Sequence, residues 1–122
     1  MFTIQGIRCS FPLQLQIGHG VFADNLSAGV SCTGVGESFI KLGVARRVAS
    51  NIADLGYSPN GAITEALATM TTRVGGDGGV IAISPQGEVG IEWNSEQMSW
   101  AWGREGLLHY GVNRGEDFVE NI

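Results

Sequence analysis

The residues with the clearest chemical potential form a short turn, Thr33-Gly34-Val35-Gly36, between an apolar run and a long amphipathic pattern. A strand that ends in Thr-Gly-x-Gly and leads into a helix presents backbone N–H groups and the positive end of the helix dipole. An anionic or oxyanionic group can bind to such groups. We therefore take this 33–36 turn as the candidate site and ask which chemistry its neighbours permit.

Two phosphate-binding interpretations fail on the residues around the turn. A Walker loop has Gly, four residues and then Gly-Lys-Ser/Thr, but here Ser31 replaces the first glycine and Glu37 replaces the lysine. A carboxylate at that position repels phosphate. The dinucleotide pattern G-x-G-x-x-G would place Phe39 at its third glycine. A ring there holds helix and strand apart, so this interpretation is weak.

A third interpretation is an oxyanion or substrate clamp. The Thr33 hydroxyl and the Gly34 N–H, aimed at one point, can stabilise negative charge developing on a carbonyl oxygen. Such a clamp needs a nucleophile, which the turn does not contain. A plain tight turn that begins a helix explains the same residues without any chemistry, and the motif alone leaves both explanations open.

The other reactive side chains favour structural roles. His19 lies between two glycines, and a loop histidine explains it better than a ligand or base without a partner cluster. Cys9 and Cys32 are the only cysteines and do not make a disulfide framework. Cys32 is interpreted as a small core side chain in a strand rather than a reactive thiol. Met70 belongs to an apolar helical stripe and is assigned to the core.

Composition limits the class of protein. A chain of 122 residues fits one small domain, and such a chain buries roughly two thirds of its unfolded surface. The net charge is -5, and the seven Lys and Arg are scattered, which argues against nucleic acid and anionic membranes as partners. No apolar run approaches the ~20 residues of a membrane span. The start lacks a secretory pattern, so we expect a cytoplasmic protein, with no cofactor and no metal.

Hydrophobic periodicity predicts an α+β domain with two helices packed on one face of an antiparallel sheet. The first helix is predicted over residues 38–55 and ends at Gly56; the second begins at Ser58-Pro59 and stops at a glycine-rich run. Residues 18–20 are predicted as a turn and 21–25 as a connection. Strands are predicted over residues 11–17, 26–32, 80–84, 89–93 and 107–112, and an acidic tail that need not be ordered follows from Gly115.

A series of motifs resembles one family. V-F-A-D-N is followed by G-V-S-C-T-G-V-G-E-S-F-I-K, V-A-R-R-V, R-V-G-G-D-G-G-V-I-A-I-S, W-N-S-E-Q-M-S-W-A and G-L-L-H-Y-G-V. In this order they resemble the β-chain of the plant-type L-asparaginases, or isoaspartyl peptidases, over residues 18–113. The resemblance implies part of the αββα sandwich of an N-terminal-nucleophile hydrolase. In that family a precursor cleaves itself to expose a threonine. This threonine attacks the side-chain amide of asparagine or a β-aspartyl dipeptide, and its own amino group serves as the base.

The resemblance gives roles to the 33–36 turn. Thr33 and Gly34 match the oxyanion hole, Gly34 and Gly36 match substrate-binding positions, and Val35 stands where histidine is common. The resemblance also implies that a structural stretch runs close behind the nucleophile, formed by Gly76, Asp77, Gly78 and Gly79.

The family's other active-site residues are not visible in this chain. Thr3 lies near the start, but the I-Q-G-I-R that follows it does not match the strand of the nucleophilic threonine. The segment S-F-P-L-Q-L stands in the place of Gly-Arg-Val-Gly-Asp, and the nearby Arg8 and Ser10 do not fit its spacing. The α-chain is also absent.

We therefore expect a divergent segment (1–17), a partial asparaginase domain (18–113) and the acidic tail (114–122). Such a product, truncated or alternatively spliced, would lack activity by itself. The alternative is a non-catalytic interaction module that pairs with another copy or with a full-length relative.

Overall fold

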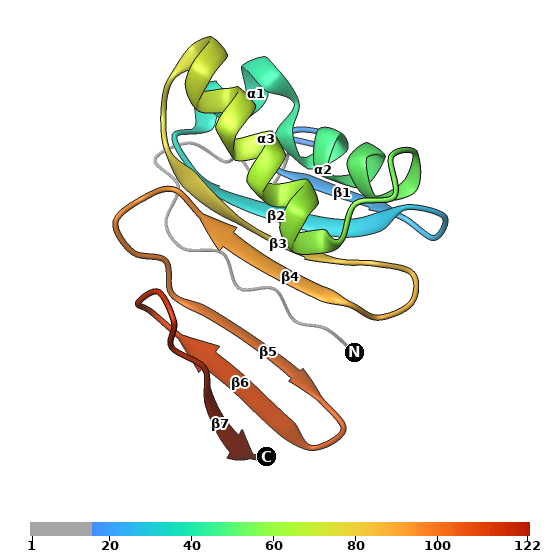
Figure 1. The fold of residues 1–122 in the computed structure, drawn as a ribbon, viewed down its shortest axis with the longest axis vertical. Coiled ribbons are helices and arrows are strands. Elements are labelled where there is room, and N and C mark those ends of the chain that lie inside the picture. The colour runs from blue at the N-terminus through green and yellow to red at the C-terminus, as the bar shows by residue number, and fades with distance from the viewer. Residues whose placement is uncertain (1–15) are drawn as a thin grey trace.

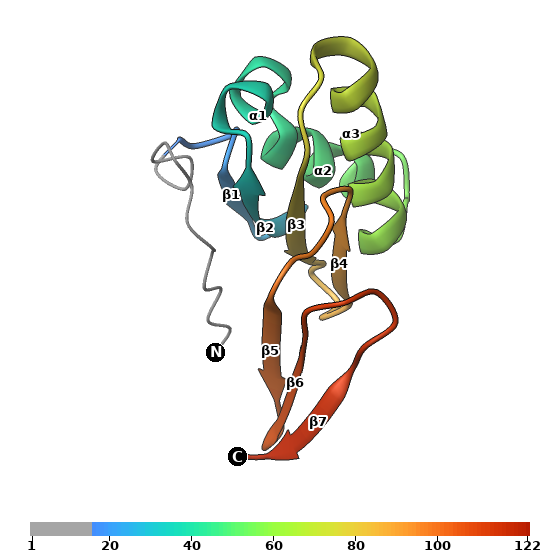
Figure 2. The same ribbon diagram turned by 90° about the vertical axis from the view of Figure 1, so that its left-hand side faces the viewer.

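The computed structural model describes residues 16–122, which form three helices and seven strands (Figure 1). The strands build two antiparallel sheets, one ordered β1-β2-β3-β4 and one ordered β5-β6-β7. The three-stranded sheet lies at the opposite end of the molecule from the helices (Figure 2). In chain order the elements are β1 Val21–Asp24, β2 Ala28–Gly34, α1 Gly36–Leu42, α2 Val44–Ala53, α3 Pro59–Val74, β3 Gly78–Ile83, β4 Val89–Trp93, β5 Trp100–Arg104, β6 Leu107–Gly111 and β7 Phe118–Asn121. The α+β class is confirmed.

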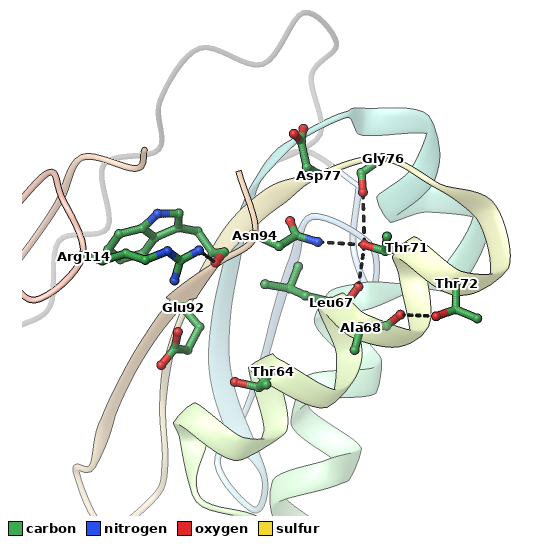
Figure 3. Close-up of a pocket in the computed structure, with 11 residues that line it drawn as sticks. Thr64, Leu67, Ala68, Thr71, Thr72, Gly76, Asp77, Glu92, Asn94 and Arg114 are labelled. Atoms are coloured by element: carbon green, nitrogen blue, oxygen red, sulfur yellow. Dashed lines mark hydrogen bonds between the residues drawn. The ribbon is translucent and has the colours of Figure 1, made fainter. Parts of the chain in front are cut away.

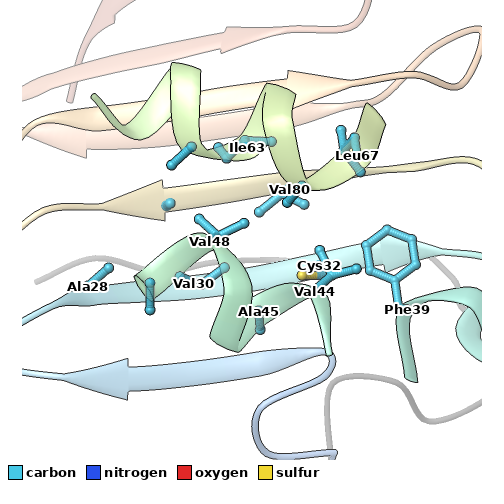
Figure 4. Packing of buried hydrophobic residues seen from close by; sticks show 14 of the residues in the cluster. Ala28, Val30, Cys32, Phe39, Val44, Ala45, Val48, Ile63, Leu67 and Val80 are labelled. Carbon is cyan, nitrogen blue, oxygen red and sulfur yellow. The ribbon is translucent and has the colours of Figure 1, made fainter. Parts of the chain in front are cut away.

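The hydrophobic core lies between the helices and one face of the four-stranded sheet (Figure 4). Because side chains alternate along a strand, every second residue of β2 and β3 faces the helices. Cys32 of β2 lies opposite Val80 of β3, and both are buried. The Cys32 and Met70 side chains, 1% and 0% exposed, therefore belong to the core as expected. Phe39, Val44, Val48 and Ile63 fill the helix side.

The single helix predicted over residues 38–55 is wrong, because Gly43 divides it into α1 and α2. Gly43 adopts a left-handed conformation with φ 69°, and its N–H donates to the carbonyls of Phe39 and Ile40, which ends α1. The apolar stripe continues across the break, so periodicity alone does not reveal it. Within residues 16–122, three helices therefore pack on the sheet instead of the predicted two.

The second predicted helix is confirmed as α3. The Ser58 hydroxyl accepts a hydrogen bond from the Gly61 N–H at 3.2 Å, and Pro59 occupies the first turn. Gly75, with φ 73°, follows the last helical residue, as the glycine-rich run predicted. Among the helices that the structure describes, none has the length and apolar character needed to cross a bilayer.

The predicted strands in the middle of the chain are confirmed as β4, with the predicted bounds, and as β2, β3 and β6, with shifted ends; residues 18–20 form the predicted turn. Three strands were missed. Residues 21–24 form β1 instead of a connection, residues 100–104 form β5, and residues 118–121 of the predicted tail form β7. Most of the strand predicted over residues 11–17 lies outside the described residues. The missed strands are short, and their ladders depend on partners that a local pattern does not reveal.

Two arginines of the three-stranded region reach the backbone at the two ends of β4. Arg104 donates a hydrogen bond to the Gly87 carbonyl in the β3–β4 turn. Arg114 donates to the Trp93 carbonyl at 2.5 Å, and its guanidinium carbon lies 4.9 Å from the centre of a Trp93 ring. These contacts attach the smaller sheet to the edge strand of the larger one.

Candidate active site

The 33–36 turn joins β2 to α1 as the sequence predicted. Thr33 and Gly34 are the last two residues of β2, and Gly36 is the first residue of α1. In the β2–β3 ladder, Thr33 lies opposite Gly79 and Gly34 lies opposite Gly78. The structure thus brings the predicted turn residues together with the predicted glycine-rich stretch, hereafter the 75–79 loop.

The two segments approach so closely that only glycine fits at the contact. A Cβ atom on Gly34 would lie 2.5 Å from the Asp77 carbonyl oxygen and 2.6 Å from the Gly78 Cα. A Cβ on Gly78 would overlap the Thr33 carbonyl oxygen, and one on Gly76 would overlap the Ser38 hydroxyl. Gly34 also has φ +142°, which side chains disfavour. These glycines let one backbone lie directly against the other.

The Phe39 ring covers this glycine contact. Phe39 is fully buried, and its Cε2 would lie 3.0 Å from a Cβ on Gly34 and 2.7 Å from one on Gly78. The ring therefore occupies the space beside both glycines. This location agrees with the argument that residue 39 is too bulky for the close helix–strand packing of a dinucleotide-binding turn.

Part of the backbone at the turn already has partners. The Val35 N–H donates to the Asp77 carbonyl at 3.1 Å, and the N–H groups of Ser38 and Phe39 donate to the Val35 carbonyl. The exposed Glu37 adds a negative charge in the first turn of α1. The general expectation of unpaired N–H groups is thus wrong for these three residues. Thr33 and Gly34 also make interactions in this structure, so their oxyanion-binding role, like the substrate-binding role of Gly36, stays a prediction.

The alternation of β2 places the Thr33 side chain on the sheet face opposite the helices, since its neighbour Cys32 faces the core. Thr33 is half-buried there. Gly79, its partner on β3, lies opposite Trp93 of β4. A Cβ on Gly79 would lie 2.9 Å from the Trp93 Cβ and would overlap the Met98 sulfur. Trp93 and Met98, 8% and 5% exposed, thus line this face beside Thr33.

Sequence reasoning did not assign a site role to these two residues, although both lie in the W-N-S-E-Q-M-S-W-A motif. A pocket of about 550 Å³ adjoins the same region, between the solvent-facing side of α3 and the end of β4 (Figure 3). Gly76 and Asp77 of the 75–79 loop line it, together with Asn94. The aromatic and sulfur-containing side chains of the motif were the only available signal.

His19 has the structural role that the sequence favoured. Its carbonyl accepts a hydrogen bond from the Ala45 N–H at 3.0 Å, and the Gly18 carbonyl accepts one from the Arg46 N–H at 2.9 Å. The turn thereby satisfies two amides in the first turn of α2. The His19 ring nitrogen Nδ1 is buried and has no hydrogen-bond partner within residues 16–122. Thr3, Arg8, Cys9 and Ser10 lie outside the described residues.

With this geometry in view, comparison with known proteins defines the family. Residues 15–112 match the family model described as Asparaginase, so the chain belongs to that family. A probable isoaspartyl peptidase/L-asparaginase of Drosophila melanogaster is 36% identical over 96 residues, which are 79% of this chain and 29% of the relative. An isoaspartyl peptidase/L-asparaginase of Xenopus laevis is 41% identical over 103 residues, 84% of this chain and 33% of the relative.

The corresponding protein of Homo sapiens is 35% identical over 106 residues, 87% of this chain and 34% of the relative. The chain therefore spans about a third of the length of the curated relatives that it matches. The family prediction made from the motifs is confirmed. The partial-length match supports the interpretation that this chain is a fragment of a protein of that family.

Proposed function

We propose that this chain supplies the oxyanion-stabilising part of an isoaspartyl peptidase/L-asparaginase active site. The observation that supports the proposal is the position of Thr33 and Gly34 at the end of β2, directly against the 75–79 loop. The substrates would be the side-chain amide of asparagine and β-aspartyl dipeptides. Gly34 and Gly36 would contact the bound substrate.

In the proposed reaction, the electron pair of a nucleophile forms a bond to the amide carbonyl carbon, and the π electron pair of the C=O bond moves onto the carbonyl oxygen. The Thr33 hydroxyl and the Gly34 N–H would donate hydrogen bonds to that oxygen and lower the barrier. The nucleophilic threonine and the substrate-binding Arg and Asp are not seen in this chain. We therefore expect the 122-residue polypeptide alone to release no ammonia from asparagine.

The test supplies the missing groups in a second chain. The part of the Xenopus relative that this chain does not match is co-expressed with it, and ammonia release from asparagine and a β-aspartyl dipeptide is measured. We expect activity only in the combined sample, and Thr33→Ala should lower kcat by about a hundredfold or more.

Thr72→Ala, an exposed substitution on α3, is the matched control and should leave the rate unchanged. Turnover by the isolated chain would refute the absence of a nucleophile. Turnover by the combined chains that Thr33→Ala does not affect would refute the oxyanion role.

A second candidate function is that of a non-catalytic interaction module, and strand β7 favours it. β7 pairs with β6 on one side only, so its other edge is open among the described strands. Phe118 and Val119 are 51% and 49% exposed, and Ile122 beyond the strand is 75% exposed. An open edge with apolar side chains is a surface that pairs with another chain.

Light scattering after size exclusion tests this candidate, with and without a full-length relative. We expect association that Val119→Lys weakens, because a lysine on an edge strand opposes pairing. Leu26→Lys, at an exposed position next to β1, is the control and should not change the mass. A stable monomer that does not bind the relative would argue against this function.

A further inference from the structure

Asn94, the residue after β4, holds both backbone groups of Gly78. Its N–H donates to the Gly78 carbonyl at 2.9 Å, and its side-chain Oδ1 accepts from the Gly78 N–H at 2.8 Å. At the point where the β3–β4 ladder ends, Asn94 alone thus makes both of the hydrogen bonds with Gly78 that a paired strand residue would make. The side chain cannot be exchanged for an apolar one without leaving the Gly78 N–H unpaired.

The same side chain connects to helix α3. Asn94 Nδ2 donates to the Thr71 hydroxyl at 2.8 Å (Figure 3). The Thr71 hydroxyl lies 3.1 Å from the Leu67 carbonyl and 3.3 Å from the Gly76 carbonyl, to which it can donate its single proton. Asn94 and Thr71 therefore hold the 75–79 loop from two directions.

The side chains of this loop do little to fix it. Its backbone is held at one end by the Gly75 N–H, which donates to the Thr71 carbonyl at 3.2 Å, and at the other end by the pairing of Gly78 and Gly79 as the first residues of β3. Four of its five residues are glycines, and Gly75 and Gly76 adopt positive φ values of 73° and 91°. Glycine loses more conformational freedom on ordering than any other residue. The fifth residue, Asp77, has an exposed side chain. Hydrogen bonds from neighbouring elements must therefore fix the path of this loop.

The path of the loop determines the geometry of the 33–36 turn. The Asp77 carbonyl accepts the Val35 N–H, and Gly78 lies against Gly34 with no room for a Cβ on either residue. A shift of the loop would change the direction of the Val35 amide and the space around Gly34. Contacts this close transmit small displacements, because a packed interior has few voids to absorb them.

We propose that Asn94, supported by Thr71, is a positioning residue for the Thr33–Gly34 oxyanion site. It acts through the 75–79 loop and touches neither substrate nor the reacting atoms. The description of the site as an oxyanion hole rests on the proposed function. The connection from Asn94 to the turn is a property of the backbone and is tested without any hydrolysis assay.

The experiment measures amide hydrogen exchange by NMR in the wild-type chain, Asn94→Ala and Thr71→Val. In Asn94→Ala we expect exchange at Gly78 and Val35 to become about tenfold faster or more, since each loses a direct or indirect hydrogen-bond constraint. Val48 and Ile63, in α2 and α3, should exchange as in the wild type. Thr71→Val keeps the side-chain shape and should produce the same pattern with a smaller effect.

Asn60→Ala is the matched control. Asn60 lies in α3, and its Oδ1 accepts a hydrogen bond from the N–H of Ile91 in β4 at 2.9 Å, away from the 75–79 loop. It should speed exchange at Ile91 and leave Val35 unchanged. Unchanged Val35 exchange in Asn94→Ala, or equal acceleration at every amide, would overturn the proposal. If Asn94→Ala does not fold, Thr71→Val decides the question by the same criterion. Either result leaves the hydrolysis test of the proposed function independent.

Discussion

Replacing Glu65 by glutamine removes the charge from the network that joins α2 to α3. The Glu65 carboxylate accepts hydrogen bonds from Arg47 Nε at 3.1 Å and Nη2 at 2.7 Å. It also accepts from Asn51 Nδ2 at 2.6 Å and from the Thr69 hydroxyl at 2.8 Å. The bond from Arg47 is the largest cause that lowers the pKa of Glu65 from 4.5 to about 2.

The size of the effect follows from that pKa. One pKa unit corresponds to about 1.36 kcal/mol, so the full depression would correspond to about 3 kcal/mol. The Glu65 and Arg47 side chains are 30% and 36% exposed, and water screens their interaction. Glutamine keeps one acceptor oxygen, but its NH2 group would stand where the second carboxylate oxygen accepts from Arg47, and a donor there cannot pair with the guanidinium. We therefore expect Glu65→Gln to lower the free energy of unfolding by about 1–2 kcal/mol at neutral pH.

The pH dependence gives a sharper test. The folded-state pKa is depressed, so the carboxylate contributes its stability above the unfolded pKa and loses it as pH falls toward about 2. Urea unfolding followed by circular dichroism measures the difference between wild type and Glu65→Gln at several pH values. The difference should be constant above about pH 5 and shrink between about pH 4.5 and 2.

The control for this experiment is Glu96→Gln, since Glu96 is an exposed glutamate with no hydrogen-bond partner among the residues that the structure describes. It should leave the unfolding free energy unchanged within about 0.5 kcal/mol. Equal stability of wild type and Glu65→Gln at neutral pH, or a difference that does not shrink in acid, would refute the assignment of this stability to the Glu65 carboxylate.

Three further predictions, the first with Gly56→Ala as its control, test backbone contact, helix capping and core packing by urea or thermal unfolding. Gly34→Ala should lower the free energy of unfolding by more than about 2 kcal/mol, because its Cβ would lie 2.5 Å from the Asp77 oxygen. Gly56→Ala, at a position with open space and φ +71°, should lower it by about 1 kcal/mol. Equal losses at the two positions would contradict the steric argument. Ser58→Ala removes the acceptor for the Gly61 N–H and should cost about 1 kcal/mol, whereas a neutral result would deny a role for the cap. Ile63→Ala empties a fully buried position and should cost about 2–5 kcal/mol; a loss below 1 kcal/mol would mean that the core refills the cavity.

Local signals explain which elements the sequence predicted well. Ser58, Pro59 and Gly75 specify both ends of α3 by capping and backbone conformation, and these effects act within one helical turn. Gly43 carries a similar signal, but it lies inside an unbroken apolar stripe. The first amides of α2 are satisfied by the carbonyls of Gly18 and His19, a distant turn. No periodicity in residues 38–55 contains that information.

The short strands also show why local sequence patterns did not predict every element. β4 was predicted with correct bounds because an apolar run and the turn at Pro85 and Gly87 define a hairpin locally. β1, β5 and β7 have four or five residues each, and their ladders form only with neighbours that the rest of the fold places beside them. The stabilising hydrogen bonds of such strands lie outside the segment itself.

For the candidate site too, the sequence predicted some features and the tertiary structure added others. The Thr33-Gly34-Val35-Gly36 pattern predicted the strand-to-helix turn that the structure shows, and Glu37 and Phe39 argued against a phosphate loop and a dinucleotide-binding turn. The ordered motifs determined the asparaginase family, which the comparisons confirm. Each of these conclusions depends on residue types at fixed spacing along the chain.

Only the tertiary structure decided what the turn rests against. It placed the 75–79 loop on Gly34, directed the Val35 amide to Asp77 and set Asn94 as the residue that pairs with Gly78. The sequence supplies glycines that permit such contacts, because a missing Cβ removes a steric barrier. It does not state which backbone will occupy the space. That choice depends on hydrogen bonds between residues far apart in the chain, and these form only when sheet and helices pack together.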